Sequence, residues 1–125
     1  MLGLGNATTI AELWETSESK AALPVPAEEF FAASGPLLDR ASCRRAHERY
    51  YLRCRAIIKK DSLTHAAYLQ DISRMGMGLL SPVQLFPRQR IQLWMENQSS
   101  YQLEITRCRR LGPNCYACGT VFILK

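Results

Sequence analysis

From residue 50 onward, apolar and polar residues alternate along the chain, with the two-residue period of a strand that buries one face. The alternation is clearest where Ile91, Leu93 and Met95 share one face. Turn-forming residues separate the alternating segments. Short strands divided by turns are typical of an all-β barrel or sandwich, and a barrel is favoured because closure removes exposed strand edges. The pattern predicts six strands, over residues 50–58, 64–72, 77–80, 90–95, 101–106 and 116–124.

The residues before position 43 follow helical spacing instead. Ile10, Leu13 and Trp14 fall at i, i+3 and i+4, so they share one face of a predicted short helix. A break that contains prolines follows this helix. A second short helix is expected to begin with Pro26 at its first position and to stop at Gly35, because proline suits the start of a helix and glycine its end.

Charge divides the chain at nearly the same place. Residues 1–40 hold six acidic and two basic side chains, a net −4, whereas residues 41–125 hold fourteen basic and five acidic ones, a net +9. We therefore predict an acidic helical extension over 1–42 and a basic β-barrel domain over 43–125. The positive charge of the barrel indicates an anionic partner, which could be a nucleic acid, a nucleotide, a phospholipid surface or the acidic extension itself.

The sequence shows no recognisable membrane or export signal. Its apolar runs are shorter than the roughly 18–20 residues of a membrane span. Residues 1–6 lack the basic and apolar regions that begin a secretory signal. We therefore expect a soluble cytoplasmic protein that does not insert into membranes.

The cysteines predict reduced thiols, because there are five of them, an odd number, and no export signal. Cys115 and Cys118 form a CxxC motif, and on a strand this separation would place them on opposite faces. Neither a second CxxC nor a paired histidine follows. Small core residues are therefore favoured over a zinc site, and we expect neither a metal nor a cofactor.

Three arginines, Arg44, Arg45 and Arg49, gather directly before the first predicted strand. A guanidinium is a planar fork of donors that can bind a phosphate, or the O6/N7 edge of guanine, through two parallel hydrogen bonds. It can also stack on the face of a base. The stretch therefore suits an anionic purine ligand, although a solvated charge run beside a strand is the simpler alternative.

A second group of polar residues, Asp71, Ser73 and Gly76, ends the second predicted strand. Asp71 and Ser73 alternate, so both side chains are expected on one face. A carboxylate accepts hydrogen bonds from guanine N1–H and N2–H₂, and a hydroxyl can serve a base or a phosphate. Gly76 permits either a positive φ or a close approach of the backbone. The alternative is an ordinary junction between a strand and a turn, where these residue types are common.

Taken together, the two groups resemble the signature of the PilZ domain family, Arg-x-x-x-Arg before one strand and Asp/Asn-x-Ser-x-x-Gly after the next. The matching stretches are Arg45-Ala46-His47-Glu48-Arg49 and Asp71-Ile72-Ser73-Arg74-Met75-Gly76. The resemblance covers roughly residues 43–124. It implies a mainly β fold, a six-stranded antiparallel barrel here preceded by short N-terminal helices, that binds cyclic di-GMP on its outer surface. Arg45 and Arg49 would hold guanine and phosphate, Asp71 and Ser73 would read guanine, and Gly76 would shape the turn.

The resemblance also bears on how many ligand molecules bind. Cyclic di-GMP can self-stack into an intercalated pair, and an arginine immediately before the first motif arginine tends to allow that pair in the family. Arg44 occupies this position, so we expect two ligand molecules per chain. The chain departs from the family in Glu48, where proline is frequent, and in having no helix after its last strand.

These observations favour a cyclic di-GMP receptor or adaptor that changes conformation and signals to an unidentified effector protein. Motility, exopolysaccharide synthesis and virulence are typical outputs of the family. One alternative is a PilZ-like interaction module that binds no ligand. Another is a small basic β-barrel for single-stranded nucleic acid, although nucleic acid is not the partner we expect, since only Trp94 beside Arg88 and Arg90 suggests it. An enzyme is least favoured, because no pattern places an acid, a base or a nucleophile.

Overall fold

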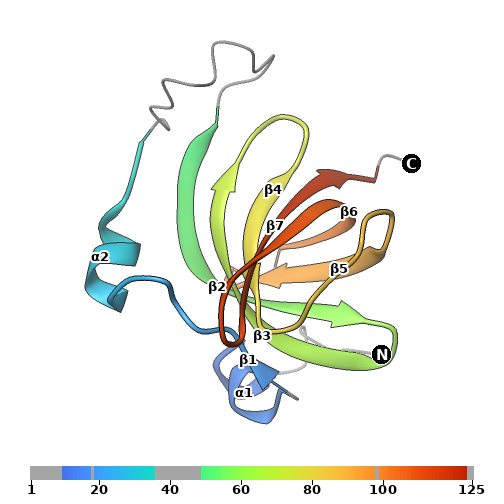
Figure 1. Cartoon of the computed structure of the whole chain (residues 1–125), viewed down its shortest axis with the longest axis horizontal. Helices are drawn as coiled ribbons and strands as arrows, with labels where there is room; N and C mark the ends of the chain where they lie inside the picture. The colour runs from blue at the N-terminus through green and yellow to red at the C-terminus, as the bar shows by residue number, and fades with distance from the viewer. Residues whose placement is uncertain (1–9, 18, 36–48, 98, 124–125) are drawn as a thin grey trace.

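The computed structural model describes residues 10–17, 19–35, 49–97 and 99–123. Six strands close into an antiparallel barrel in the order β3-β2-β5-β6-β7-β4, because β4 pairs with both β7 and β3 (Figure 1). The predicted mainly β class and the six-stranded antiparallel barrel are confirmed. The elements are α1 (Ile10–Thr16), β1 (Ser19–Lys20), α2 (Ala27–Ala32), β2 (Tyr50–Lys60), β3 (Leu63–Ile72), β4 (Met77–Ser81), β5 (Arg90–Met95), β6 (Ser100–Gly112) and β7 (Cys115–Phe122).

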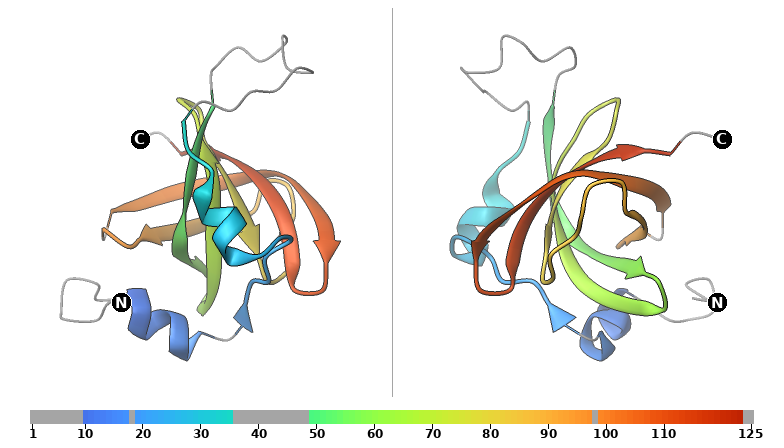
Figure 2. Two further views of the ribbon diagram at one scale, coloured as in Figure 1. Left: turned by 90° about the vertical axis from the view of Figure 1, so that its left-hand side faces the viewer. Right: turned by 45° about the vertical axis from the view of Figure 1, so that its right-hand side comes forward.

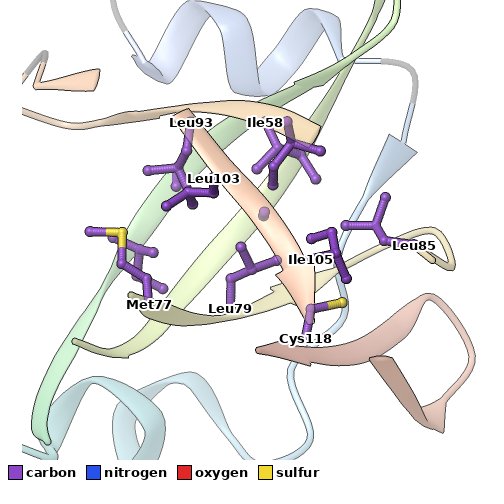
Figure 3. Packing of buried hydrophobic residues seen from close by; sticks show 12 residues of the cluster. Ile58, Met77, Leu79, Leu85, Leu93, Leu103, Ile105 and Cys118 are labelled. Carbon is purple, nitrogen blue, oxygen red and sulfur yellow. The ribbon is translucent and has the colours of Figure 1, made fainter. Parts of the chain in front are cut away.

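The alternating apolar residues of the strands fill the inside of the barrel. Figure 3 shows side chains from several strands meeting there, among them Ile58, Leu79 and Leu103. These three residues are fully buried, as expected for the apolar face of a strand with period two. The closed core fixes the strands, and the outward side chains are thereby held at defined positions on the barrel wall.

Two strands differ most from the sequence prediction, while β2, β3, β4 and β7 differ by only one or two residues at an end. The strand β6 continues to Gly112, six residues beyond the predicted end, because its pairing with β7 continues to Gly112↔Cys115. Bulges within this pairing interrupt the alternation on which the prediction depended. The two-residue strand β1 was not predicted, because two residues are too few to show a period.

The first helix, α1, lies on the outside of the barrel (Figure 2). Of the predicted apolar face, Leu13 and Trp14 contact the barrel, since Trp14 packs with Ile57, Ala66 and Trp94 in a buried cluster and Leu13 packs against it. The Ile10 side chain lies outside the described part of the chain. Trp94 therefore belongs to the contact between α1 and the wall and is only 7% exposed. This burial removes the exposed aromatic platform on which the nucleic-acid alternative depended.

The second helix, α2, is also outside the barrel, beside β2 (Figure 1). Phe30 packs with Tyr68 and Leu80 in a third cluster. Pro26 precedes the helix as its N-cap residue, so the helix begins one residue later than predicted. The predicted stop at Gly35 is wrong, because the helix ends at Ala32 and the backbone is already extended at Ala33. Gly35 has a φ of 81°, three residues beyond the helix. None of the described helices has the length and apolarity that crossing a membrane requires.

The two cysteines of the CxxC motif lie on opposite faces of β7, as predicted. Cys118 belongs to the core inside the barrel, whereas Cys115 belongs to the cluster around Phe30 on the outside. Within the described ranges, no three side chains among His, Cys, Asp and Glu gather closely enough to hold a metal ion.

Candidate functional site

The candidate site lies where β2 begins and β3 ends. Arg49 directly precedes β2, and Asp71 lies opposite Tyr51 in the antiparallel pairing of β2 with β3. Arg49 Nη1 donates to Asp71 Oδ1 at 2.6 Å. The fold thus joins one residue from each of the two predicted stretches, although they are 22 positions apart in the sequence. Arg44 and Arg45 lie outside the described residues.

The Arg49–Asp71 ion pair is partly shielded from water. The side chains are 22% and 15% exposed, so the charge-assisted hydrogen bond is screened less than a pair on the open surface. Among the described residues, each group nevertheless keeps unused hydrogen-bonding capacity, because a guanidinium has five donors and a carboxylate two acceptor oxygens. The pair therefore presents a cation and an acceptor side by side to any ligand at this edge.

Ser73 and Gly76 form the turn that follows β3. The Ser73 amide donates to the Gly76 carbonyl at 2.9 Å, and the Met75 amide donates to Ser73 Oγ at 3.2 Å. The Ser73 hydroxyl thus stabilises its own turn as an acceptor, while its proton stays available to another acceptor.

Gly76 is required by the close approach of the neighbouring strand. Its φ is not among the positive values, but a Cβ at this position would lie 1.9 Å from the carbonyl oxygen of Thr120 on β7. Of the two reasons for a glycine that the sequence offered, the structure shows the close backbone approach. The Thr120 hydroxyl also accepts from the Met77 amide, so β7 holds the turn against the barrel.

Two residues near the pair were missed by sequence reasoning. A Cβ at Gly78 would lie 2.8 Å from Asp71 Oδ1, so glycine at this position leaves room for the carboxylate. The signal was present, since Gly78 follows Gly76 by two positions, but its importance depends on the pairing Asp71↔Gly78.

The second missed residue, Arg53, connects the site to α2. Its Nε donates to the Gln70 carbonyl at 3.0 Å and its Nη1 to the Phe30 carbonyl at 3.3 Å. Its guanidinium carbon lies 4.2 Å from the centre of the Phe30 ring, a cation–π contact. Burial lowers the pKa of Arg53 below its ordinary value, while Tyr51 and Asp71 act in the opposite direction. Alternation indicates that Arg53 points outward, but it does not reveal a partner 23 positions away.

The arrangement is that of a small barrel with an arginine–carboxylate pair and a glycine turn at one edge. The PilZ domain family model matches residues 44–123, most of the chain. The chain therefore belongs to the PilZ domain family, whose members are generally receptors for cyclic di-GMP without enzymatic activity. A search among curated proteins finds no relative that matches the sequence.

Proposed function

We propose that this protein is a cytoplasmic receptor for cyclic di-GMP, which binds at the edge where Arg49 meets Asp71. The observation that carries the proposal is the 2.6 Å ion pair between these two residues. It brings the end of the Arg-x-x-x-Arg stretch beside the start of the Asp-x-Ser-x-x-Gly stretch. A ligand that contacts both stretches needs them to lie close together.

The chemistry of the site fits a guanine dinucleotide. Arg45 and Arg49 supply guanidinium forks for phosphate and for a guanine edge. Asp71 supplies the acceptors for guanine N1–H and N2–H₂, and the Ser73 hydroxyl has a proton to donate. In the free protein Arg49 neutralises the Asp71 carboxylate, so binding exchanges this ion pair for charge-assisted bonds to the ligand. Gly76 keeps the turn close to β7 and so holds Ser73 beside the site.

The number of ligand molecules follows from Arg44. An intercalated pair of cyclic di-GMP molecules adds phosphates and exposed guanine faces beyond those of a single ligand. A third guanidinium beside Arg45 offers both stacking and Coulomb attraction to this added surface. We therefore expect two ligand molecules per chain.

The signal is proposed to leave through the N-terminal segment. Arg53 follows Arg49 by four positions on the chain and binds the Phe30 carbonyl of α2. A ligand that reorganises Arg49 and Asp71 changes the electrostatic surroundings of Arg53, and thereby the hold on α2. The altered surface would be read by an effector protein.

The test is calorimetric titration of the purified chain with cyclic di-GMP, GMP and GTP. We expect cyclic di-GMP to bind most tightly, and Arg49→Ala to weaken it by about 2–4 kcal/mol, because the substitution removes charge-assisted bonds to a doubly charged ligand. Arg55→Ala is the matched control, since Arg55 lies on β2, the strand that Arg49 precedes, but pairs with Glu96 away from the site. Absence of heat with the wild-type chain would refute the proposal and favour an interaction module without a ligand.

The same titration measures the stoichiometry. The wild-type chain should bind two molecules of cyclic di-GMP and Arg44→Leu only one, because leucine blocks the second molecule and offers it no charge. A wild-type stoichiometry near one that Arg44→Leu leaves unchanged would remove Arg44 from ligand pairing without affecting the proposed receptor function.

A further inference from the structure

A row of four residues crosses the outside of the barrel beside the candidate site. The strand pairings Asp71↔Gly78, Gly78↔Gly119 and Arg107↔Gly119 run in sequence over β3, β4, β7 and β6. Residues directly paired across strands share one face of a sheet. Two glycines therefore separate a carboxylate at one end of the row from a guanidinium at the other.

Both end side chains lie over the glycines. A Cβ at Gly78 would meet the Asp71 carboxylate oxygens, and a Cβ at Gly119 would lie 2.8 Å from Arg107 Nε and 3.3 Å from its Cζ. The Arg107 side chain thus lies over Gly119 of β7, while the Asp71 side chain lies over Gly78 of β4 from the opposite side. Since neighbouring strands lie about 4.8 Å apart, the two groups converge over a strip only two strands wide.

Arg107 has no partner of its own among the residues that the structure describes. No ion pair or hydrogen bond joins Arg107 to any other described side chain. Asp71, at the other end of the row, pairs with Arg49 instead. Among the described residues, this exposed guanidinium at the end of the glycine row therefore keeps its fork of donors unused.

The next row of the same face differs, because it is covered. Tyr68 pairs with Leu80 and Leu80 with Ala117, and Phe30 of α2 packs on this cluster. The direct pairing of Arg109 with Ala117 places Arg109 at the end of that covered row. Two arginines of one strand, two positions apart, therefore face different surroundings: Arg107 ends the glycine row and Arg109 the row beneath α2.

We propose that Arg107 is a specificity-determining residue of the site, donating to the O6/N7 edge of the guanine whose N1–H and N2–H₂ Asp71 accepts; this inference rests on the proposed function. A guanine that donates its N1–H and N2–H₂ to Asp71 turns its O6/N7 edge away from Asp71, towards Arg107 on β6. Arginine is suited to that edge in guanine, since O6 and N7 are both acceptors, whereas adenine offers one acceptor and one donor there. The glycines keep the strip between the two groups free of side chains.

The experiment compares cyclic di-GMP with cyclic di-AMP in titrations of Arg107→Ala and Arg109→Ala. We expect Arg107→Ala to weaken cyclic di-GMP on the order of tenfold or more and cyclic di-AMP much less, so that selectivity between them falls. Arg107→Lys should lose selectivity too, because a lysine keeps the charge but lacks the planar fork. Arg109→Ala should change neither affinity.

Each outcome separates this inference from the proposed function. If the wild-type chain binds cyclic di-GMP and Arg107→Ala leaves the affinity unchanged, only the role of Arg107 is refuted. If Arg107→Ala weakens both dinucleotides equally, or Arg107→Lys restores full binding, Arg107 binds phosphate and the reading of guanine is refuted. If the wild-type chain binds neither dinucleotide, the receptor function fails and this inference with it. Thermal melting of each variant establishes that it is folded.

Discussion

At the scale of single residues, the candidate site depends on two glycines, because a side chain at either position would collide with its neighbours. Gly76 lets the turn after β3 approach the Thr120 carbonyl, and Gly78 gives the Asp71 carboxylate its place above β4. The obstacle at Gly76 is backbone, which cannot move aside without displacing β7. The obstacle at Gly78 is the side chain that the site uses. A methyl group at either position would therefore disturb the site in a different way.

Gly76→Ala is expected to lower the free energy of unfolding by at least about 2 kcal/mol, because its Cβ would overlap the Thr120 carbonyl and force the turn away from β7. Urea denaturation followed by tryptophan fluorescence measures the loss. Gly112→Ala is the matched control, since nothing lies within 4 Å of a Cβ there. Equal stability of the two variants would contradict the steric role of Gly76.

Sequence patterns can single out residues whose motif is local. Asp71, Ser73 and Gly76 lie in one short stretch, and their motif could be recognised without a fold. Arg53 and Arg107 could not be found in this way, because their importance depends on Phe30 and Gly119, which the fold brings to them from other parts of the chain. Alternation shows that a side chain points outward, but it does not show what the side chain meets there.

At the scale of elements, α2 is too short to be stable alone. It has six residues, its N-cap Pro26 makes no side-chain capping hydrogen bond, and isolated helices of this length do not persist in water. Its stability must come from packing against the barrel. The main contact is Phe30, which is 1% exposed and lies in edge-to-face contact with Tyr68 at 5.6 Å between ring centres.

Phe30→Ala should lower the free energy of unfolding by about 3 kcal/mol, the usual cost of removing a buried phenylalanine side chain. The neighbouring Phe31→Ala is the control and should cost about 1 kcal/mol or less, since Phe31 is 41% exposed. Chemical denaturation of both variants gives the comparison. A cost for Phe31→Ala as large as that for Phe30→Ala would show that α2 is not held through Phe30.

The elements also show where sequence patterns stop being informative. The strand β5 agrees with its predicted bounds, because its alternation is regular and it lies between clear turns. The prediction for β6 ended six residues too early, because a bulge between Ile105 and Arg107 shifts the pairing and the polar residues beyond it resemble a loop. That missed part contains Arg107, so the error in one strand end also concealed a residue of the proposed site.

At the scale of the whole molecule, one strand connects the site to both helices. Strand β2 starts beside Arg49, carries Arg53 against Phe30 of α2, and carries Arg55, whose guanidinium carbon lies 5.5 Å from the centre of the Trp14 ring of α1. The outward side chains of a single strand thus connect the candidate site with α2 and then with α1. A change at Arg49 is therefore expected to affect α2, through the nearby Arg53, more than α1, through the more distant Arg55.

Hydrogen exchange should detect this connection. Cyclic di-GMP is expected to speed exchange in α2, because ligand phosphate attracts the Arg53 guanidinium away from the Phe30 carbonyl, and to change α1 less. Mass spectrometry of peptides covering residues 10–35, with and without ligand, measures the effect, and Arg49→Ala serves as the variant in which it should vanish. Identical exchange in this segment in both states would refute signalling through the N-terminal helices.

The two-residue strand β1 has a consequence for the order in which the molecule is made. Strand β4 pairs with β3 only from Tyr68 onward, and β1 adds to the same strand earlier, at His65 and Ala66. Ser19 therefore leaves the ribosome 46 residues before the residue beside which it finally lies. Until β3 has paired, β1 has no edge to join, and the long loop between them adds to the entropy of closure. The segment that contains β1 must therefore wait for a strand synthesised well after it before it can form its own pairing.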